Sequence, residues 1–142
     1  MKNVKWVTIL FILLLVAIVF AADSRQMPAF VARLYDFPNG DKVGHFVLMG
    51  TLSLLVNLVV LAGPGRRTLP RAIRASLVVA GAVALEEFSQ RFFPGRNSSW
   101  ADLAASLAGI IVFGGLAWFL VERKKGDVQI NETNKPQGGS KA

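Results

Sequence analysis

The chain has 142 residues, of which 53% are hydrophobic, and its formal net charge is +7. This length suits a single domain, and the apolar fraction exceeds the roughly 45–50% of soluble proteins, so a lipid bilayer is the expected solvent. The absence of cysteine and the single histidine, His45, exclude disulfides, thiolate metal sites and histidine-rich metal sites.

The sixteen Lys and Arg residues lie between apolar runs and do not form one contiguous basic stretch. Nucleic acid is therefore not an expected partner, because basic charge without a recognisable reading motif is typical of many other proteins. The sequence contains neither a glycine-rich phosphate loop nor a metal motif of standard spacing, so no cofactor is expected.

Four apolar segments predict membrane-spanning helices at about residues 4–22, 43–62, 71–92 and 101–121. A helix needs roughly 20 apolar residues to cross about 30 Å of hydrocarbon, because it rises about 1.5 Å per residue. The predicted fold is therefore all-α: an integral membrane bundle of four transmembrane helices within residues 1–122.

The first segment also fits a second interpretation. Lys2 and Lys5 precede an apolar run that ends in the small residues Ala21 and Ala22, as in a secretory signal peptide. The run is longer than the roughly 7–15 residues of a signal core, so it serves equally well as a retained anchor. Cleavage would leave the other three helices in the same orientation.

Lys and Arg residues in the short connections predict the orientation, since cytoplasmic loops are enriched in them. Such residues precede the first segment, crowd the connection after the second without any acidic residue, and follow the fourth: Lys2, Lys5, Arg66, Arg67, Arg71, Arg74, Arg123, Lys124 and Lys125. The other two connections mix both signs of charge. Both termini are therefore predicted to be cytoplasmic, with the polar residues 123–142 as a disordered tail.

The third segment carries ionisable residues that its composition does not explain. Its uninterrupted apolar core, residues 75–85, is only about 17 Å long, so the helix must continue through Glu87 and Gln90 to cross the membrane. A carboxylate at this depth costs on the order of a few kcal/mol and by default indicates a functional site. The simpler alternative is an interfacial ion pair between Glu87 and Arg91, one turn apart.

The second segment begins with Asp41, Lys42 and His45 at the same predicted membrane face. Asp41 and His45 lie one helical turn apart, and a carboxylate beside an imidazole favours its protonated form, which suits proton transfer or phosphate binding. Alternatively, Asp41 caps the start of the helix, where anions are favoured, and His45 is an ordinary interfacial polar residue.

The hairpin before the fourth segment supplies Arg96, Ser99 and Asp102. The planar fork of Arg96 suits bidentate recognition of phosphate or carboxylate. Ser99 and Asp102 have the spacing of a capping box, so the structural alternative for Asp102 is that it only begins a helix.

Seven polar residues are thus predicted to converge on the outer face: Asp41, Lys42, His45, Glu87, Gln90, Arg96 and Asp102. Because the orientation follows from charges on the opposite side, their coincidence favours one shared site over scattered caps and ion pairs. The carboxylate within the membrane is its decisive member.

The order of these residues resembles the VanZ-like family of small bacterial membrane proteins. The resemblance is carried by Asp-Lys-x-x-His-Phe from residue 41, Glu-x-x-Gln from residue 87 and Pro-Gly-Arg-x-x-Ser-x-x-Asp from residue 94. It implies a bacterial cytoplasmic (inner) membrane location and a link to resistance against teicoplanin-type glycopeptides. The family commonly has Asn four residues after the hairpin aspartate, and Ser106 stands there in this chain.

Three functions follow from this pattern. A binding site for an anionic membrane lipid or a lipid-linked cell-envelope precursor would use Arg96, Lys42 and His45 as cationic contacts. An intramembrane enzyme acting on a lipid-linked phosphate or glycosyl group would use His45 as acid or base, although no nucleophile motif supports it. A structural subunit or proton-coupled carrier is the third alternative, and the oligomeric state is left open.

Overall fold

A computed structural model describes residues 2–23, 37–63, 65, 68–92 and 99–133. Four long helices make up this part of the chain: α1 (Lys2–Asp23), α3 (Gly40–Ala62), α4 (Thr68–Ser89) and α5 (Trp100–Thr133). A short 3₁₀ turn, η1 (Gln90–Phe92), continues α4. All four helices are long and apolar enough to span a membrane. The prediction of an all-α chain with four candidate spans is confirmed.

The helix bounds differ from the predicted ones chiefly at polar ends. Helix α3 begins at Gly40, directly after Asn39, which adopts the left-handed conformation (φ 62°) that Asn tolerates better than most residues. Helix α5 continues to Thr133, whereas the prediction ended it at 121. Once a helix is nucleated, further turns add at little cost, and residues 122–125 are good helix formers. The disordered tail was predicted over residues 123–142; residues 123–133 belong to α5, and the rest, from 134 onward, lies outside the described residues.

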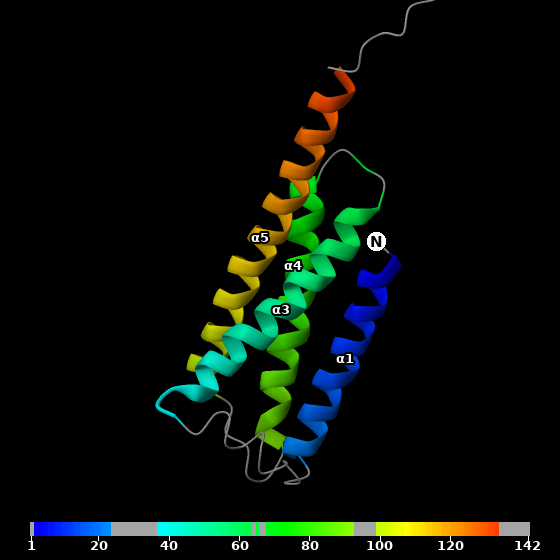
Figure 1. The fold of residues 1–142 in the computed structure, drawn as a ribbon. Coiled ribbons are helices and arrows are strands. Elements are labelled where there is room, and N and C mark those ends of the chain that lie inside the picture. The colour runs from blue at the N-terminus through cyan, green and yellow to red at the C-terminus, as the bar shows by residue number, and fades with distance from the viewer. Residues whose placement is uncertain (1, 24–36, 64, 66–67, 93–98, 134–142) are drawn as a thin grey trace, which may run out of the picture.

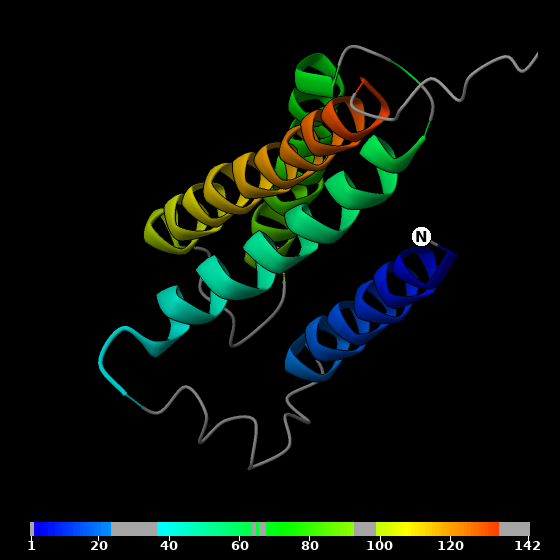
Figure 2. The same ribbon diagram turned by 45° about the horizontal axis from the view of Figure 1, so that its top comes forward.

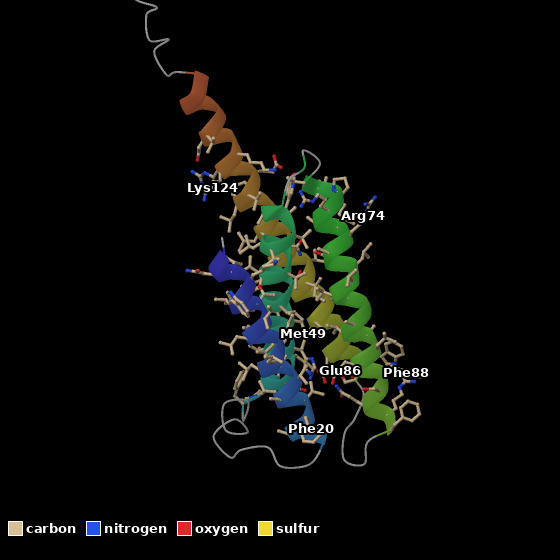
Figure 3. The ribbon with its side chains drawn as sticks, turned by 90° about the vertical axis from the view of Figure 1, so that its right-hand side faces the viewer. Phe20, Met49, Arg74, Glu86, Phe88 and Lys124 are labelled. Carbon is tan, nitrogen blue, oxygen red and sulfur yellow. The ribbon has the colours of Figure 1, made fainter. Side chains whose placement is uncertain are left out.

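Successive helices run in opposite directions, so each end of the bundle collects different parts of the chain (Figure 1). The N-terminus, the connection between α3 and α4, and the C-terminal part of α5 lie at one end, called here the termini end. The starts of α3 and α5 lie at the opposite end, called the site end. Figure 3 shows Arg74 and Lys124 toward the termini end, with Glu86 and Phe88 toward the site end.

Helices α3 and α5 cross at two glycines. A Cβ atom added at Gly109 would lie 3.0 Å from the carbonyl carbon of Phe46 and 3.1 Å from the amide nitrogen of Gly50. The rings of Phe46 and Phe113 pack edge to face beside this crossing, with centroids 5.8 Å apart. Small residues let two backbones approach closely, which is the main source of helix association in a membrane.

Helix α4 completes the packed core through Val79 and Val83, which are buried against Ile110 of α5. Helix α1 contacts α3 and stands to one side of the other helices (Figure 2). Most of its apolar side chains are exposed, including Trp6 at 72%. That exposure is expected for a helix that faces lipid, because lipid tails are as apolar as the protein interior.

A layer of polar side chains is buried among α3, α4 and α5, midway along the bundle. Asn57 Nδ2 donates to the carbonyl oxygen of Ser53 (2.9 Å) and to Ser76 Oγ (3.1 Å), and Ser53 Oγ donates to the carbonyl oxygen of Ile110 (3.1 Å). Asn57 Oδ1 has no hydrogen-bond partner among the described residues. A Cβ added at Gly114 would approach both serine hydroxyls, so Gly114 leaves the space that this layer occupies.

Side chains satisfy exposed carbonyl groups where the chain turns at the termini end. Arg71 Nη1 donates to the carbonyl oxygen of Gly63 (3.0 Å), and Arg71 Nη2 donates to that of Val60, in the last turn of α3. Lys125 Nζ reaches the carbonyl oxygen of Gly65 at 3.4 Å. Gly65 has φ +140°, a conformation that L-residues with side chains rarely adopt. Arg71 and Lys125 thus satisfy backbone carbonyl groups where α3 ends.

Candidate functional site

Lys42 joins the start of α3 to the start of α5. Its Nζ lies 3.0 Å from Asp41 Oδ2 and 3.7 Å from Asp102 Oδ1. Lys42 and Asp41 are partly exposed, whereas the side chain of Asp102 is only 13% exposed. An ammonium group has three donors, so Lys42 keeps donor capacity for a ligand after meeting these two carboxylates.

Asp102 occupies the third position of α5, in the helix start that Ser99 caps. Ser99 Oγ accepts from the Asp102 amide at 3.4 Å, as the predicted capping spacing requires. In a complete capping box the Asp102 carboxylate would accept from the Ser99 amide in return. Here that amide donates to Glu87 Oε1, at 2.6 Å. Glu87 of α4 therefore takes the place that the Asp102 carboxylate has in a complete capping box. The Asp102 carboxylate does not take part in capping.

The Asp102 carboxylate faces the interior of the site. Its Oδ1 is inaccessible to solvent and accepts no hydrogen bond from the described residues, and the nearest cation is Lys42 at 3.7 Å. A buried acceptor without a donor is costly, and such atoms deserve a functional explanation. The predicted alternative, in which Asp102 only begins the helix, does not account for this oxygen.

His45 contacts Ser106, the position at which the chain departs from the pattern of the family that it resembles. His45 Nδ1 and Ser106 Oγ lie 3.2 Å apart, and Ser106 is fully buried. The predicted partner, Asp41, instead contacts Lys42. On a helix that begins at Gly40, Asp41 turns toward the rim, while His45 faces α5. The contact holds one ring nitrogen and leaves Nε2 without a hydrogen bond among the described residues.

Two polar side chains at the end of α4 are almost completely buried. Glu87 and Gln90 are each 4% exposed. Gln90 Nε2 donates to both carboxylate oxygens of Glu86, at 2.9 and 3.1 Å, one turn earlier. Glu87 faces α5 and accepts from the Ser99 amide. The two adjacent carboxylates thus have different partners, as their 100° separation around a helix predicts.

The rim beside Glu87 is aromatic and cationic. The Arg91 guanidinium lies 5.1 Å from the centroid of the Phe88 ring and 5.8 Å from that of Trp100. The predicted alternative of a Glu87–Arg91 ion pair does not occur among the ion pairs of the described residues. Because Glu87 satisfies a backbone donor of another helix, its burial has a structural explanation of its own.

Three helices therefore bring five of the predicted residues together at the site end. Lys42 contacts both Asp41 and Asp102, and His45 lies one turn further along α3 and contacts Ser106. Glu87 joins them through the Ser99 amide. Gln90 lies alongside, bonded to Glu86, and Arg96 lies outside the described residues.

Sequence reasoning missed two of these contacts. The roles of the Ser106 hydroxyl and the Ser99 amide depend on how α5 is turned against α3 and α4, which no local motif records. The part of the chain that the structure describes contains no group of three or more acidic or histidine side chains placed to hold a metal ion.

No protein-family model, curated protein or solved structure matches the chain. Its function must therefore be inferred from the chemistry and geometry of the residues themselves.

Proposed function

We propose that the chain is a VanZ-like multi-pass protein of the bacterial cytoplasmic membrane that binds an anionic lipid or lipid-linked cell-envelope precursor at its site end. Both termini and the arginine-rich connection would face the cytoplasm, and the site end would lie in the outer leaflet. Such binding would link the protein to envelope biogenesis or to glycopeptide resistance of the teicoplanin type.

The observation that carries this proposal is the meeting of Lys42 with the buried Asp102 carboxylate at the junction of α3 and α5. Two carboxylates hold the Lys42 ammonium group in position, and its remaining donor capacity can meet a phosphate oxygen. His45, held by Ser106, presents its second nitrogen from the next turn. Arg96 would supply a further cation from the hairpin.

A second candidate function is an intramembrane enzyme acting on a lipid-linked phosphate or glycosyl group. The contact between His45 Nδ1 and Ser106 favours it, because fixing one ring nitrogen orients the other for proton transfer. Ser106 itself is fully buried, so its hydroxyl is inaccessible as a nucleophile. Water or the substrate would have to supply the attacking group.

Binding can be tested by native mass spectrometry of the purified protein with phosphatidic acid and with phosphatidylcholine. We expect Lys42→Gln to weaken phosphatidic acid binding by about tenfold, since a charge-assisted hydrogen bond contributes roughly 1.5–3 kcal/mol. Lys124→Gln, at the termini end, is the matched control and should bind as wild type. Equal binding of phosphatidic acid by wild type and Lys42→Gln would contradict the proposed site.

The enzyme alternative makes a different prediction. It requires turnover of a labelled lipid-linked phosphate that disappears in His45→Ala and Glu87→Gln, with thermal unfolding unchanged in at least one of them. Binding without turnover in the wild type would favour the binding function.

Orientation is tested separately by reporter fusions after Gly65 and after Gly95. A cytoplasmic signal at Gly65 and an external one at Gly95 are expected. The reverse pattern would place the site end in the inner leaflet.

A further inference from the structure

Arg91, in η1 at the site end, has no counter-ion among the described residues. Glu87, one turn before it, faces α5 and accepts from the Ser99 amide, and Gln90 donates to both carboxylate oxygens of Glu86. The ion pairs within the described part of the chain are those of Lys42, and Arg91 takes part in neither of them. The positive charge of Arg91 is therefore available to an anion from outside the bundle.

Two aromatic rings from different helices hold this guanidinium group. It lies 5.1 Å from the centroid of the Phe88 ring, near the end of α4, and 5.8 Å from that of Trp100, the first residue of α5. The Phe88 ring packs edge to face against Phe92, with centroids 5.8 Å apart. A cation is attracted to the ring face as a whole, which requires no hydrogen bond. The planar fork of Arg91 thus keeps its N–H donors for a ligand such as phosphate.

The position of this cluster along the bundle identifies the anion. One candidate membrane span ends at Phe92 and the next begins at Trp100, so Arg91 lies where hydrocarbon gives way to lipid headgroups. Figure 3 shows Phe88 on the outer side of α4, and the Trp100 side chain is 76% exposed. Aromatic rings that face outward at this depth are typical of the membrane interface, where the available anions are lipid phosphates.

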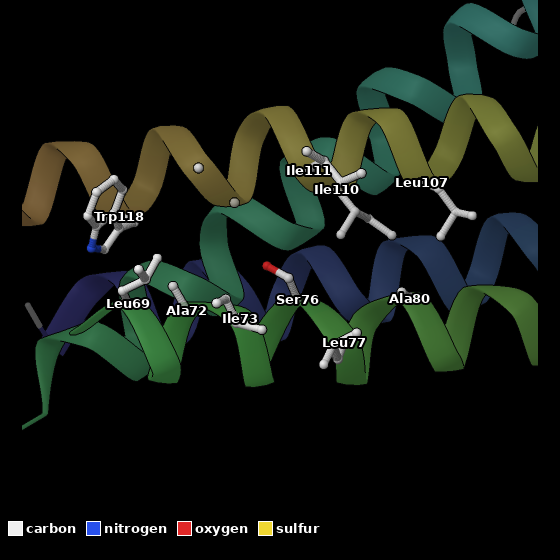
Figure 4. A pocket seen from close by; sticks show the side chains of 12 residues that line it. Leu69, Ala72, Ile73, Ser76, Leu77, Ala80, Leu107, Ile110, Ile111 and Trp118 are labelled. Carbon is white, nitrogen blue, oxygen red and sulfur yellow. The ribbon is translucent and has the colours of Figure 1, made fainter. Parts of the chain in front are cut away.

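The apolar surface between α4 and α5 adds no selectivity for a headgroup. A groove of about 400 Å³ lies between these helices, and its lining extends from Leu69 and Trp118 to Ala80 and Leu107 (Figure 4). None of its lining residues is charged. Hydrocarbon chains of any lipid can pack on such a surface, so recognition of a headgroup at the site end of α4 depends on Arg91.

We propose that Arg91, held by Phe88 and Trp100, binds the phosphate of an anionic glycerophospholipid on the lipid-facing side of α4 and α5. This site is separate from the proposed one at Lys42, which joins α3 to α5. An anionic lipid is preferred over a zwitterionic one, because the phosphate of a zwitterionic lipid already has a cation of its own. The preference follows from the charge of Arg91 and from its planar fork.

Trp100 can report on the occupant of this site, because its ring lies beside the guanidinium group. The chain has three tryptophans, so Trp6→Phe and Trp118→Phe together make Trp100 the sole fluorophore of this kind. This sole-tryptophan protein is reconstituted in mixtures of phosphatidylglycerol and phosphatidylcholine, with bromine atoms on the acyl chains of one lipid or the other. Brominated lipid quenches tryptophan on contact, so the two quenching curves give the relative affinity of the lipids at Trp100.

We expect the sole-tryptophan protein to prefer phosphatidylglycerol about fivefold, the effect of one basic side chain at a charged membrane surface. Arg91→Gln should bind the two lipids equally. Arg74→Gln is the matched control, because Arg74 is also exposed on α4 but lies toward the termini end, and it should keep the preference. Phe88→Leu retains the charge and removes one ring, so it should lower the preference. Thermal unfolding should be similar for both arginine variants.

Equal affinity for the two lipids in the sole-tryptophan protein, or a preference that persists in Arg91→Gln, would overturn the site. An unchanged preference in Phe88→Leu would overturn the role of the ring. Lys42→Gln separates this site from the proposed function: loss of the preference in that variant would assign the lipid beside Trp100 to Lys42 and would overturn a separate site. A preference that disappears in Arg91→Gln and survives in Lys42→Gln supports the site at Arg91, whether or not phosphatidic acid binds at Lys42.

Discussion

The crossing of α3 and α5 gives a sharp prediction, because it connects packing directly to the site. Replacing Gly109 with Ala places a Cβ 3.0 Å from the carbonyl carbon of Phe46, and ordinary contact requires 3.4 Å or more. The carbonyl oxygen of Phe46 would lie closer still, so the helices must separate locally by more than 0.4 Å. Phe46 adjoins His45, and Ser106 lies one turn before Gly109. The same displacement lengthens the His45–Ser106 contact from 3.2 Å to about 3.6 Å or more, beyond hydrogen-bond range.

The energetic terms of Gly109→Ala have opposite signs. A tighter core costs about 1–3 kcal/mol, and the lost hydrogen bond costs about 0.5–1.5 kcal/mol. Better helix propensity returns about 1 kcal/mol. We expect a net loss of about 1–3 kcal/mol in the free energy of unfolding, together with weaker lipid binding.

Unfolding in mixed micelles by increasing concentrations of denaturing detergent measures this change. Gly115→Ala is the control on the same helix, because a Cβ there meets no atom within 4 Å. That variant should be neutral or stabilised by up to about 1 kcal/mol. If Gly109→Ala proves as stable as Gly115→Ala, the close crossing does not control stability, and the derivation of its effect on the site fails.

Three further changes test separate contacts by the same assay. Ser99→Ala should cost about 1 kcal/mol through loss of the helix cap but preserve lipid binding, since the amide that meets Glu87 belongs to the backbone; strongly reduced binding would contradict this. A double-mutant cycle of Asn57→Ala and Ser76→Ala should give a coupling of about 0.6 kcal/mol, typical of hydrogen bonds between membrane helices, and a value near zero would exclude the bond. Thr68→Val should cost about 1–2 kcal/mol, because two side-chain bonds are lost; unchanged stability would show that these two hydrogen bonds do not stabilise the fold.

The site combines carboxylates and cations in a way that bears on its selectivity. Asp41 and Asp102 both contact Lys42, so a phosphate bound at Lys42 would have to displace or share these two ion pairs. Glu87 Oε1 accepts from the Ser99 amide, so this oxygen already has a partner within the protein. Cations held by fixed carboxylates are ordered before the ligand arrives, and such preorganisation lowers the entropic cost of binding.

Several features of the fold could be predicted from residues alone because they are local. Length and hydropathy determine how many segments can cross a bilayer, and the four candidate spans agree with that count. The spacing of Ser99 and Asp102 correctly predicted a capped helix start. The short apolar core of the third segment correctly indicated that its helix continues through Glu87, since α4 ends at Ser89 and η1 follows.

The partners of the polar residues depend on the tertiary structure. A helix that is apolar on every side carries no stripe to show which face meets its neighbours, because lipid and protein interior are equally apolar. The rotation of α5 against α3 follows instead from the close approach at Gly50 and Gly109. That rotation gives His45 the hydroxyl of Ser106 as its partner in place of Asp41.

The sequence by itself therefore determined that the chain has four apolar spans and that polar residues gather near the same ends of three of them. Only the tertiary structure decided that Glu87 completes the cap of another helix, that Asp102 is left to face Lys42, and that an apolar groove lies between α4 and α5. The physical reason is that hydropathy acts along one segment, whereas helix rotation and crossing depend on steric fit between segments distant in the chain.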